Sequence, residues 1–391
     1  MVFVNDPFIL LFGGDQSSRA VINELWAYNK DNSQWEKKES NNPPRRHRHA
    51  SVKNNDKMIT FFGEGLSGLL SDIWQYDPAT NTWEELPSGG ASTPPARKNH
   101  SVTSIGEDSY ICGGTGSDGL GLSDLWSYNH TTGIWTQKSE HPGSCAGLGS
   151  FHYDGSLYAF AGYEPEYSSY RNDIWCYSPA TNTWDYVNAG GTLPGGRAFF
   201  ATAQDPMGSF LVFGGQDTSR AIALSDNYKF DANTLTWTQL ADGPARSKAA
   251  AVYCNDTSIY LFGGLDELGN ATNNLWKYNP STDTWEEILG VDNPEVIVPL
   301  GFSLSAYPNP FSSGVTIEYQ VAGYNQWDLP ANIKIYDLKG CLVRTLPITN
   351  YQLPITNIVW DGKDTDGGEV QSGIYFIKAK GYKPVKVVKL R

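Results

Sequence analysis

The chain has 391 residues, a hydrophobic content of 40% and a formal net charge of −13. This length gives room for two or three domains with a substantial core, and the excess of acidic residues argues against non-specific nucleic-acid binding. No apolar run is long enough to span a bilayer. The 13 Trp, 22 Tyr and 40 Gly, without a long helical periodicity, predict an all-β protein of short strands and tight turns.

Residues 1–290 repeat one pattern six times. A short apolar run ends in Gly-Gly, a Trp-x-Tyr pair follows, and another Trp lies nine residues after the first aromatic of that pair. These aromatics are separated by 48 to 53 residues and are Trp26, Trp74, Trp126, Trp175, Tyr228 and Trp276. Each repeat predicts a four-stranded sheet, in which Gly-Gly ends the second strand. Such a sheet cannot bury both faces alone, so we expect the sheets to pack in a ring with Trp side chains between them.

Three irregularities accompany the repeats. We align Glu64 with the second glycine of the pair in the second repeat, and Ala161 with the first glycine in the fourth. The first repeat starts late, because Val2–Asp6 aligns with Val252–Asp256 inside the innermost strand. We therefore expect the natural polypeptide to begin upstream of Met1, in a segment that holds a signal peptide and leaves room for a seventh blade.

The repeat resembles the kelch family, through Gly-Gly, Trp-x-Tyr, the spaced Trp and an opening Pro-x-Arg-x-x-His such as Pro95–His100. The resemblance covers residues 1–290 and implies a kelch β-propeller of six, or seven, blades. Kelch propellers include binding proteins and enzymes, so the resemblance is specific for the fold and weak for the function.

Four arginines occupy the same point of four repeats and are the predicted ligand-binding residues: Arg46, Arg97, Arg197 and Arg246. Propeller symmetry is expected to place them around the channel on one face, where they would bind an anionic group of a peptide or glycan. Some kelch relatives hold acidic peptides with arginines at this position. The alternative is that each Arg pairs with acidic residues nearby. The fourth repeat has Ser144–Gly147 and no Arg, and its loop 163–171 offers Tyr163, Tyr167 and Tyr170 to a glycan.

Catalytic, metal and cofactor sites are not predicted. The six His lack metal-ligand spacing, and His49 and His100 fall at a repeat position that favours a structural role. The copper enzymes of the galactose oxidase type need a His in the C-terminal domain, but no His follows His152. A metal-independent sugar mutarotase remains the alternative to a binding protein. The five Cys, among them Cys341, show no framework of disulfide spacing.

The C-terminal region differs from the repeats: Lys and Arg outnumber Asp and Glu by ten to seven in residues 303–391. We predict a linker at 291–305 and a small Ig-like β-sandwich at 306–391. The spacing of Asp361–Gly368 favours a hairpin turn over a calcium loop, and the duplicated Leu-Pro-Ile-Thr-Asn at 346–350 and 353–357 predicts an enlarged loop.

Three motifs carry a second resemblance: Tyr307–Phe311, Ile335–Gly340, and Trp360–Asp364 with Ser372–Phe376. They resemble the C-terminal sorting domain of type IX secretion cargo, which is related to the Ig-like domain of flagellar hook-capping proteins. The resemblance implies that residues 306–391 engage the secretion machinery, and that the protein is secreted or held at the outer-membrane surface after a periplasmic stage. Together, the two resemblances predict an exported binding propeller with no nucleic-acid partner and no membrane span.

Overall fold

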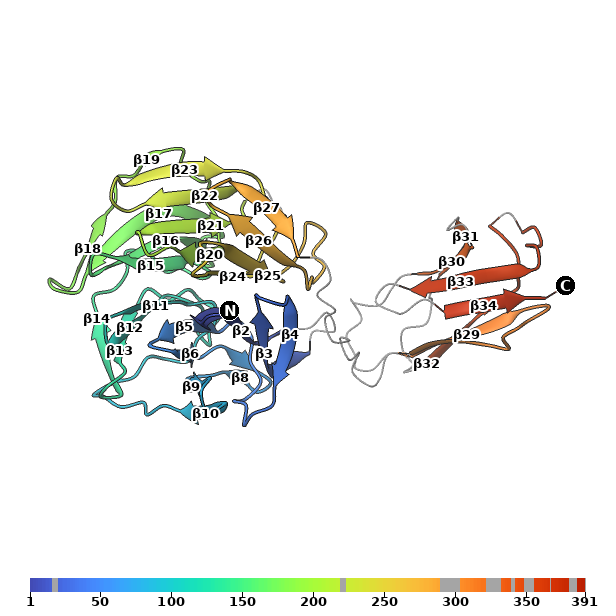
Figure 1. The fold of residues 1–391 in the computed structure, drawn as a ribbon, viewed down its shortest axis with the longest axis horizontal. Coiled ribbons are helices and arrows are strands. Elements are labelled where there is room, and N and C mark those ends of the chain that lie inside the picture. Colours follow the sequence, from blue (N-terminus) through green and yellow to red (C-terminus); the bar gives the residue numbers. More distant parts are fainter. Residues whose placement is uncertain are drawn as a thin grey trace. The chain divides into compact units, whose positions relative to one another are not determined.

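The computed structural model describes residues 1–15, 20–218, 223–288, 303–320, 332–338, 342–347, 355–365, 367–379 and 385–390. The chain divides into two compact units, Met1–Asp292 and Asn293–Arg391 (Figure 1). All regular elements in the described ranges are β-strands, and no helix there could cross a membrane. The sequence placed the end of the first unit at residue 290.

The first unit contains six antiparallel sheets, numbered 1 to 6 in chain order. Sheets 1 to 3 consist of β1 (Val2–Asn5), β2 (Phe8–Asp15), β3 (Val21–Asn29) and β4 (Gln34–Lys38); β5 (Ala50–Asn54), β6 (Lys57–Phe61), β9 (Ile73–Asp77) and β10 (Thr82–Glu85); and β11 (Ser101–Ile105), β12 (Asp108–Cys112), β13 (Leu125–Asn129) and β14 (Ile134–Lys138). A small hairpin, β7 (Glu64–Gly65) and β8 (Gly68–Leu69), lies between β6 and β9.

Sheets 4 to 6 follow the same order. They consist of β15 (Gly149–Tyr153), β16 (Ser156–Glu164), β17 (Ser169–Ser178) and β18 (Thr183–Tyr186); β20 (Ala201–Gln204), β21 (Ser209–Phe213), β22 (Asn227–Asp231) and β23 (Thr236–Leu240); and β24 (Ala250–Tyr253), β25 (Ile259–Phe262), β26 (Leu275–Asn279) and β27 (Thr284–Glu287). The short β19 (Gly190–Gly191) adds to sheet 5 beside β23. The first strands of neighbouring sheets contact one another, and β1 contacts both β5 and β24 (Figure 1).

The predicted Trp packing between sheets is confirmed. Trp83 of sheet 2 packs on Phe12 of sheet 1, with ring centroids 4.6 Å apart. The same contact joins each described pair of consecutive sheets through an aromatic or aliphatic cluster at the end of the second strand. It also joins the two ends of the series, because Trp35 of sheet 1 packs on Phe262 of sheet 6 at 5.1 Å. Burial of these rings contributes to the apolar stabilisation between sheets.

The Gly-Gly corner forms a second connection between sheets. The N–H of the second glycine donates to a backbone carbonyl at the start of the next sheet, as from Gly14 to Arg46 at 2.9 Å and from Gly63 to Arg97 at 3.0 Å. A Cβ on Gly114 would lie 2.8 Å from the carbonyl oxygen of Lys98, so this position excludes a side chain as well as requiring φ of +105°.

One alignment is corrected by these corners. Phe62 adopts φ of +53° and Gly63 φ of +102°, which match the +63° and +105° of Gly13 and Gly14. Phe62 therefore replaces the first glycine, and Glu64 aligns with Asp15 instead of replacing the second glycine. In the fourth repeat Ala161, at φ of +60°, does replace the first glycine.

The second unit consists of two small sheets, as predicted. One contains β28 (Ser303–Tyr307), β29 (Val315–Gln320) and β32 (Ile355–Trp360), and the other contains β30 (Asn332–Asp337), β31 (Leu342–Pro347), β33 (Gly373–Ala379) and β34 (Val385–Lys389). Phe311 and Trp360 lie in the core between them. The predicted linker extended too far, because β28 begins at Ser303. Residues 289–302, Cys341 and part of the duplicated loop lie outside the described residues.

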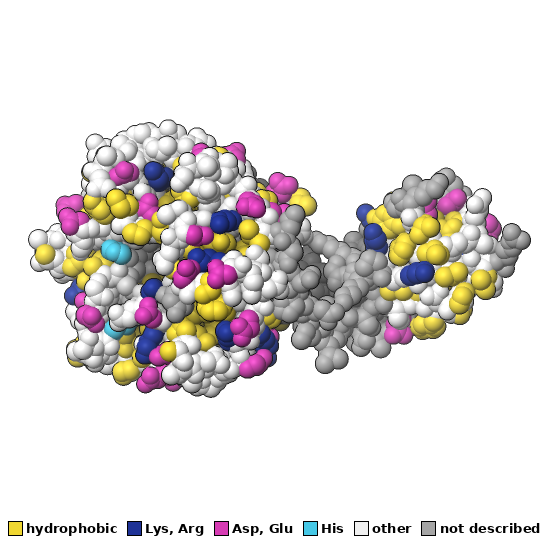
Figure 2. All heavy atoms as spheres, viewed as in Figure 1, with side chains coloured by type: hydrophobic (Ala, Val, Ile, Leu, Met, Phe, Trp, Pro, Cys, Tyr) yellow, Lys and Arg dark blue, Asp and Glu magenta, His cyan; other side chains and the backbone are white. Residues whose placement is uncertain are grey.

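The two units also differ in the surface side chains that Figure 2 shows. On the visible face of the first unit, acidic and basic side chains are interspersed, whereas apolar side chains are prominent on the visible face of the second. Exposed apolar side chains of the second unit include Leu338, Leu342 and Val359.

Candidate functional site

Three of the four predicted arginines are buried and paired with an aspartate of their own sheet. We call each pair an arginine–aspartate knot. Two guanidinium nitrogens approach the two carboxylate oxygens at 2.8 and 2.7 Å in Arg46–Asp72, at 2.6 and 2.6 Å in Arg97–Asp124, and at 2.9 and 2.8 Å in Arg197–Asp226. The exposed fractions of the arginine side chains are 0%, 0% and 2%, so the guanidinium groups do not face open solvent.

The other hydrogen bonds of each knot go to nearby backbone carbonyls and to a tryptophan side chain. Arg97 donates to the carbonyls of Pro95 and Gly113 at 3.1 and 3.0 Å, and the indole N–H of Trp126 donates to Asp124 at 2.7 Å. Burial alone would raise the pKa of Asp72, but the hydrogen bond and charge of Arg46 outweigh it and lower that pKa. Each knot therefore fixes the Gly-Gly corner to the start of the third strand.

Sheet 4 builds an equivalent contact from a different arginine. The carbonyl of Cys145 accepts from Gly114 at 2.7 Å, so Cys145 occupies the repeat position of the arginine. Arg171 of β17 binds Asp173 instead, with Nε 2.9 Å from Oδ1, and its Nη1 lies 2.9 Å from Glu164. The side-chain hydrogen bond to Asp173 is the first cause of a raised pKa for Arg171. The absence of an arginine from the Ser144–Gly147 segment is thus compensated from another strand.

Sheet 6 lacks the acidic partner. Asn274 stands where sheets 2 to 5 have aspartate and sheet 1 has Glu24, and its amide bonds Glu287. Arg246 donates to the carbonyl of Ala245 at 2.7 Å, and burial lowers its pKa. The four predicted arginines therefore lie in four sheets, and three of them form knots. Local pairing, the alternative drawn from the sequence, accounts for those three, and ligand binding by the four stays a prediction.

Charged side chains that lie one or two residues after the repeat arginines converge on the carboxylates of Glu64 and Asp15. Glu64 accepts from Lys98 at 2.9 Å and from Arg48 at 3.1 Å, and it lies 3.2 Å from Nε2 of His47. The Nδ1 of the same imidazole lies 2.5 Å from Asp15. Burial alone would raise the pKa of Glu64, but the hydrogen bond from Lys98 contributes to lowering it. We call this group, together with Lys248, the charged mouth.

A belt of backbone hydrogen bonds places these residues around a common centre. The N–H of Asn99 donates to the carbonyl of Arg48, Gly147 to Asn99, Phe199 to Gly147, and Lys248 to Phe199, at 2.7 to 2.9 Å. All five residues have φ between +54° and +66°, which turns the chain at the start of each innermost strand. Lys248 and Arg48 are therefore neighbours of the same opening although 200 residues separate them.

Lys248 is the least neutralised cation of the charged mouth. Its side chain is exposed, yet partial desolvation lowers its pKa, and the positive charge of Arg48 lowers it further. Its Nζ lies 5.6 Å from the ring centroid of Phe199. An incoming carboxylate would relieve the repulsion between Lys248 and Arg48, so this pair is suited to an anionic group.

Apolar side chains project from the loops that leave the same end of the sheets. The four loops between second and third strands that are described in full each carry one exposed apolar side chain at the tip. Their exposed fractions are 77% for Leu66, 47% for Leu120, 76% for Tyr167 and 75% for Leu268. We call these side chains the apolar tips. Tyr163 and Tyr170, expected to be exposed, are partly buried and pack on each other at 4.9 Å.

Several titratable groups outside the mouth are buried. Burial raises the pKa values of the Cys112 and Cys254 thiols and, together with the charge of Arg97, lowers that of His100 to about 3. Cys112, Cys145, Cys176 and Cys254 are unpaired. No group of three His, Cys, Asp or Glu side chains in the described ranges has the geometry of a metal site. Sequence reasoning missed the charged mouth, although its His47, Arg48, Lys98 and Lys248 lie one or two residues after a repeat arginine.

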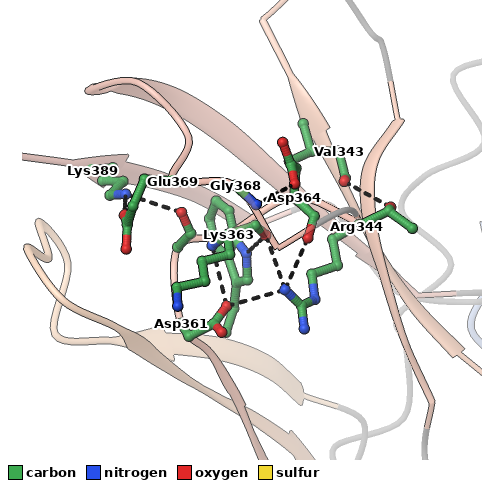
Figure 3. A network of polar contacts seen from close by, with 11 residues as sticks. Val343, Arg344, Asp361, Lys363, Asp364, Gly368, Glu369 and Lys389 are labelled. Carbon is green, nitrogen blue, oxygen red and sulfur yellow. Dashed lines mark hydrogen bonds and ion pairs between the residues drawn. The ribbon is translucent and has the colours of Figure 1, made fainter.

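The second unit contains a polar network around its last strand (Figure 3). The buried Lys389 amine donates to Glu369 at 2.6 Å and to the carbonyls of Gly362 and Val370 at 3.0 Å. Arg344 donates to the Asp364 carbonyl at 3.0 Å, and the Asp364 side chain accepts from Gly368 at 2.8 Å. The predicted hairpin turn is confirmed by this bond and by the bridge between Lys363 and Glu369.

The asparagine of the Pro-Asn-Pro motif also forms hydrogen bonds with the last strand, β34. Asn309 donates to the Lys386 carbonyl at 2.8 Å and accepts from the Val388 N–H at 2.9 Å. Phe311 follows it into the core, where its ring lies 5.4 Å from that of Trp360. Two of the motifs that suggested a sorting domain, Tyr307–Phe311 and Trp360–Asp364 with Ser372–Phe376, therefore help to hold β34 in place, whereas Ile335–Asp337 of the third motif pair with β31 and β33.

Sheets with these corners and aromatic contacts define a kelch-type β-propeller. The KLHDC2/KLHL20/DRC7 Kelch-repeats domain matches residues 1–147 and 147–296, which is most of the chain. The chain therefore belongs to the kelch-repeat family. The FlgD Ig-like domain matches residues 328–384 in the second unit.

Known relatives share the kelch part. Kelch domain-containing protein 3 of Bos taurus is 26% identical over 274 residues, which are 63% of this chain and 71% of that protein. Kelch domain-containing protein 10 of Rattus norvegicus is 28% identical over 221 residues, 51% of this chain and 53% of that protein. Kelch-like protein 25 of Xenopus tropicalis is 25% identical over 248 residues, 60% of this chain and 39% of that protein.

Proposed function

We propose that the first unit is a closed six-bladed propeller that binds a polypeptide partner at the charged mouth. The contact of Trp35 with Phe262 between sheets 1 and 6 supports closure, because it repeats the contact between consecutive sheets. Kelch relatives support a binding role over a catalytic one. No arrangement in the described ranges specifically favours the sugar mutarotase alternative.

The observation that carries this proposal is the combination of apolar tips and charged mouth. Exposed apolar side chains surround polar groups on one end of the unit, which is the composition of a surface that a protein partner desolvates. Arg48 and Lys248 would bind a carboxylate of the partner, while Leu66, Tyr167 and Leu268 would pack on its apolar side chains. This assignment moves the anion site predicted for the arginines by two residues along the chain.

A random-peptide phage library panned on the full chain tests this site. We expect enriched peptides with a carboxylate and apolar residues, and a loss of affinity of about tenfold or more in Leu66→Ser/Tyr167→Ser/Leu268→Ser, because about 1.4 kcal/mol of contact energy suffices for tenfold. Met207→Ser is the matched control, since Met207 is 78% exposed in a hairpin at the opposite end. Peptides that bind the triple variant as well as the unchanged chain, or no enrichment, would refute the proposal.

We further propose that the second unit directs export by type IX secretion, which places the propeller outside the cell. The resemblance of its three motifs supports this, as does the way Asn309 and Lys389 fix the last strand. A fusion of residues 303–391 to a secreted reporter, expressed in a bacterium with that system, should reach the surface. An Asn309→Ala/Lys389→Ala fusion should stay in the periplasm. Equal surface levels of both fusions would contradict this role of the fixed strand.

A further inference from the structure

A groove of about 1070 Å³ lies at the end of sheets 1 to 3 that carries their hairpin turns. It is lined by Phe8, Leu10 and residues 36–39 of sheet 1, by residues 54–57 and 75–79 of sheet 2, and by Glu107, His130 and Thr131 of sheet 3. In these antiparallel sheets, the turns after the first and third strands lie opposite the loops that carry the apolar tips. The groove is therefore separate from the charged mouth.

The cations of the groove are already paired. Lys37 lies 2.7 Å from Glu24, Lys38 lies 2.7 Å from Glu36, and Lys57 lies 3.4 Å from Asp77. The lining residues include further carboxylates, Glu39, Asp56 and Glu107, so acidic side chains outnumber the lysines. An anionic ligand would meet repulsion here and would have to break these pairs.

Three amide side chains of the groove are free, whereas its Asn81 and Tyr76 bond each other. Asn54, Asn55 and Gln75 line it, and among the described contacts none of their amides has a side-chain hydrogen bond. An amide offers two donors and one carbonyl acceptor, which can serve adjacent hydroxyl groups of a sugar ring. Phe8 is partly exposed at the same surface and provides an aromatic contact. The volume exceeds that of most small-molecule pockets and fits a ligand of several sugar units.

From paired charges, free amides and an accessible aromatic ring, we propose that this groove binds a neutral oligosaccharide. Asn54 and Gln75, which the strand register places on the same face of sheet 2, would bond its hydroxyl groups, and Phe8 would contact an apolar face of one sugar. This site is independent of the polypeptide site proposed for the charged mouth.

An array of neutral and uronic-acid hexasaccharides, followed by calorimetric titration of the best neutral one, tests the groove with the full chain. We expect binding that is insensitive to salt and that weakens by about thirtyfold in Asn54→Ala/Gln75→Ala, since the two lost hydrogen bonds contribute about 1 kcal/mol each. The matched control is Gln137→Ala/Gln239→Ala, whose exposed amides lie on the outer strands β14 and β23, outside the groove.

Thermal unfolding of each variant verifies that these partly exposed positions leave the fold intact. The Leu66→Ser/Tyr167→Ser/Leu268→Ser variant should bind the hexasaccharide normally, so failure of the polypeptide proposal and failure of this one are distinguishable. The proposal is overturned if no neutral hexasaccharide binds, if uronic-acid chains bind better, or if the control variant loses as much affinity as the groove variant. Selection of a peptide that requires Asn54 and Gln75 would likewise overturn it.

Discussion

Sheets 3 and 6 carry the same repeat but fix their corners differently. In sheet 3, Arg97 is buried and bonded to Asp124, and Trp126 donates to the same carboxylate. In sheet 6, Asn274 replaces the aspartate and Arg246 has a backbone carbonyl as its hydrogen-bond acceptor. The arginine recurs in both sheets, whereas its partner does not.

This difference shows that a recurring charged residue in a repeat need not mark a ligand site. The Arg97 guanidinium in sheet 3 is engaged in the hydrogen bonds of the corner that it stabilises, so it is not available to a ligand. Sheet 4 supports the same conclusion, because it has no arginine at the repeat position and makes the contact through Arg171 instead. Function is better sought in neighbouring positions that vary between repeats, such as Arg48, Asn99 and Lys248.

The largest expected effect comes from breaking the knot of sheet 3. Asp124→Ala leaves the buried Arg97 charge unpaired, which should lower the free energy of unfolding by about 3–5 kcal/mol. Urea denaturation of the full chain, followed by Trp fluorescence, measures it. Arg97→Met/Asp124→Leu removes both charges and should recover most of the loss. A single variant that costs less than about 1 kcal/mol would show that the knot is not structural.

A smaller loss is expected in sheet 4. Arg171→Ala leaves Asp173 and Glu164 without their cation, and these partly buried carboxylates should cost about 1–3 kcal/mol in unfolding free energy. Adding Cys145→Arg restores an arginine at the repeat position and should regain part of the stability. The exposed Arg45→Ala serves as control. If Cys145→Arg destabilises the unchanged chain and the Arg171→Ala variant equally, the proposed equivalence of the two positions is wrong.

A pH effect distinguishes sheets 3 and 4 at one further position. His100 has Leu148 as its counterpart, and its pKa of about 3 lies below the ordinary value of 6.5. Between these values the unfolded chain binds a proton that the folded chain excludes, so stability falls on acidification by at most about 1.4 kcal/mol per pH unit. His100→Leu should reduce the fall of the unfolding temperature between pH 6.5 and 4, and the remaining fall comes from the other histidines whose pKa values burial lowers, His49 among them. An unchanged slope in this variant would exclude His100 as its cause.

The aspartates produce a separate loss at lower pH. The pKa values of Asp72 and Asp226 are held below 3.8, so their stabilising contribution is complete above that pH and is lost as pH falls through the folded-state values. His100→Leu should leave this acid transition in place. Its disappearance in that variant would mean that the histidine, and not the carboxylates, controls acid unfolding.

The smallest expected effect is a gain in sheet 6. Asn274→Asp supplies Arg246 with a carboxylate, and Glu287→Gln removes the neighbouring acid and copies Gln137 of sheet 3. The double variant should gain about 1–2 kcal/mol by forming a charge-assisted bond. Thermal unfolding should then occur a few degrees higher. A lower unfolding temperature would show that a carboxylate at position 274 does not stabilise the corner of sheet 6.

Much of the fold followed from local patterns. The glycine pairs, the alternating Trp-x-Tyr and the nine-residue offset predicted the strand order, and short apolar segments predicted six strands of the second unit. The misaligned Glu64 has a physical reason: Phe62 adopts a backbone conformation usually left to glycine, so residue type alone gave the wrong position. The predicted linker 291–305 included the first residues of β28, so the start of that strand was not predicted.

The site was less accessible to sequence reasoning. Arg46, Arg97 and Arg197 were identified as a set, but their aspartate partners lie 26 to 29 residues away, and only the folded sheet brings them together. The charged mouth joins Asp15, Glu64 and Lys248 from three repeats. These positions are not conserved from repeat to repeat within the chain, so no recurring residue type revealed them.

The corner bond from the second glycine to the next sheet has a consequence for protein engineering. Gly63 and Gly162 are anchored to the carbonyls of Arg97 and Arg197 before the loops 64–71 and 163–171 begin. Each loop thus leaves from a base that is fixed by a neighbouring sheet and not by the loop's own sequence. Residues 65–70 and 165–170, which leave Glu64, Glu164 and Arg171 in place, could be randomised in length and composition as a binder library, with the framework unchanged.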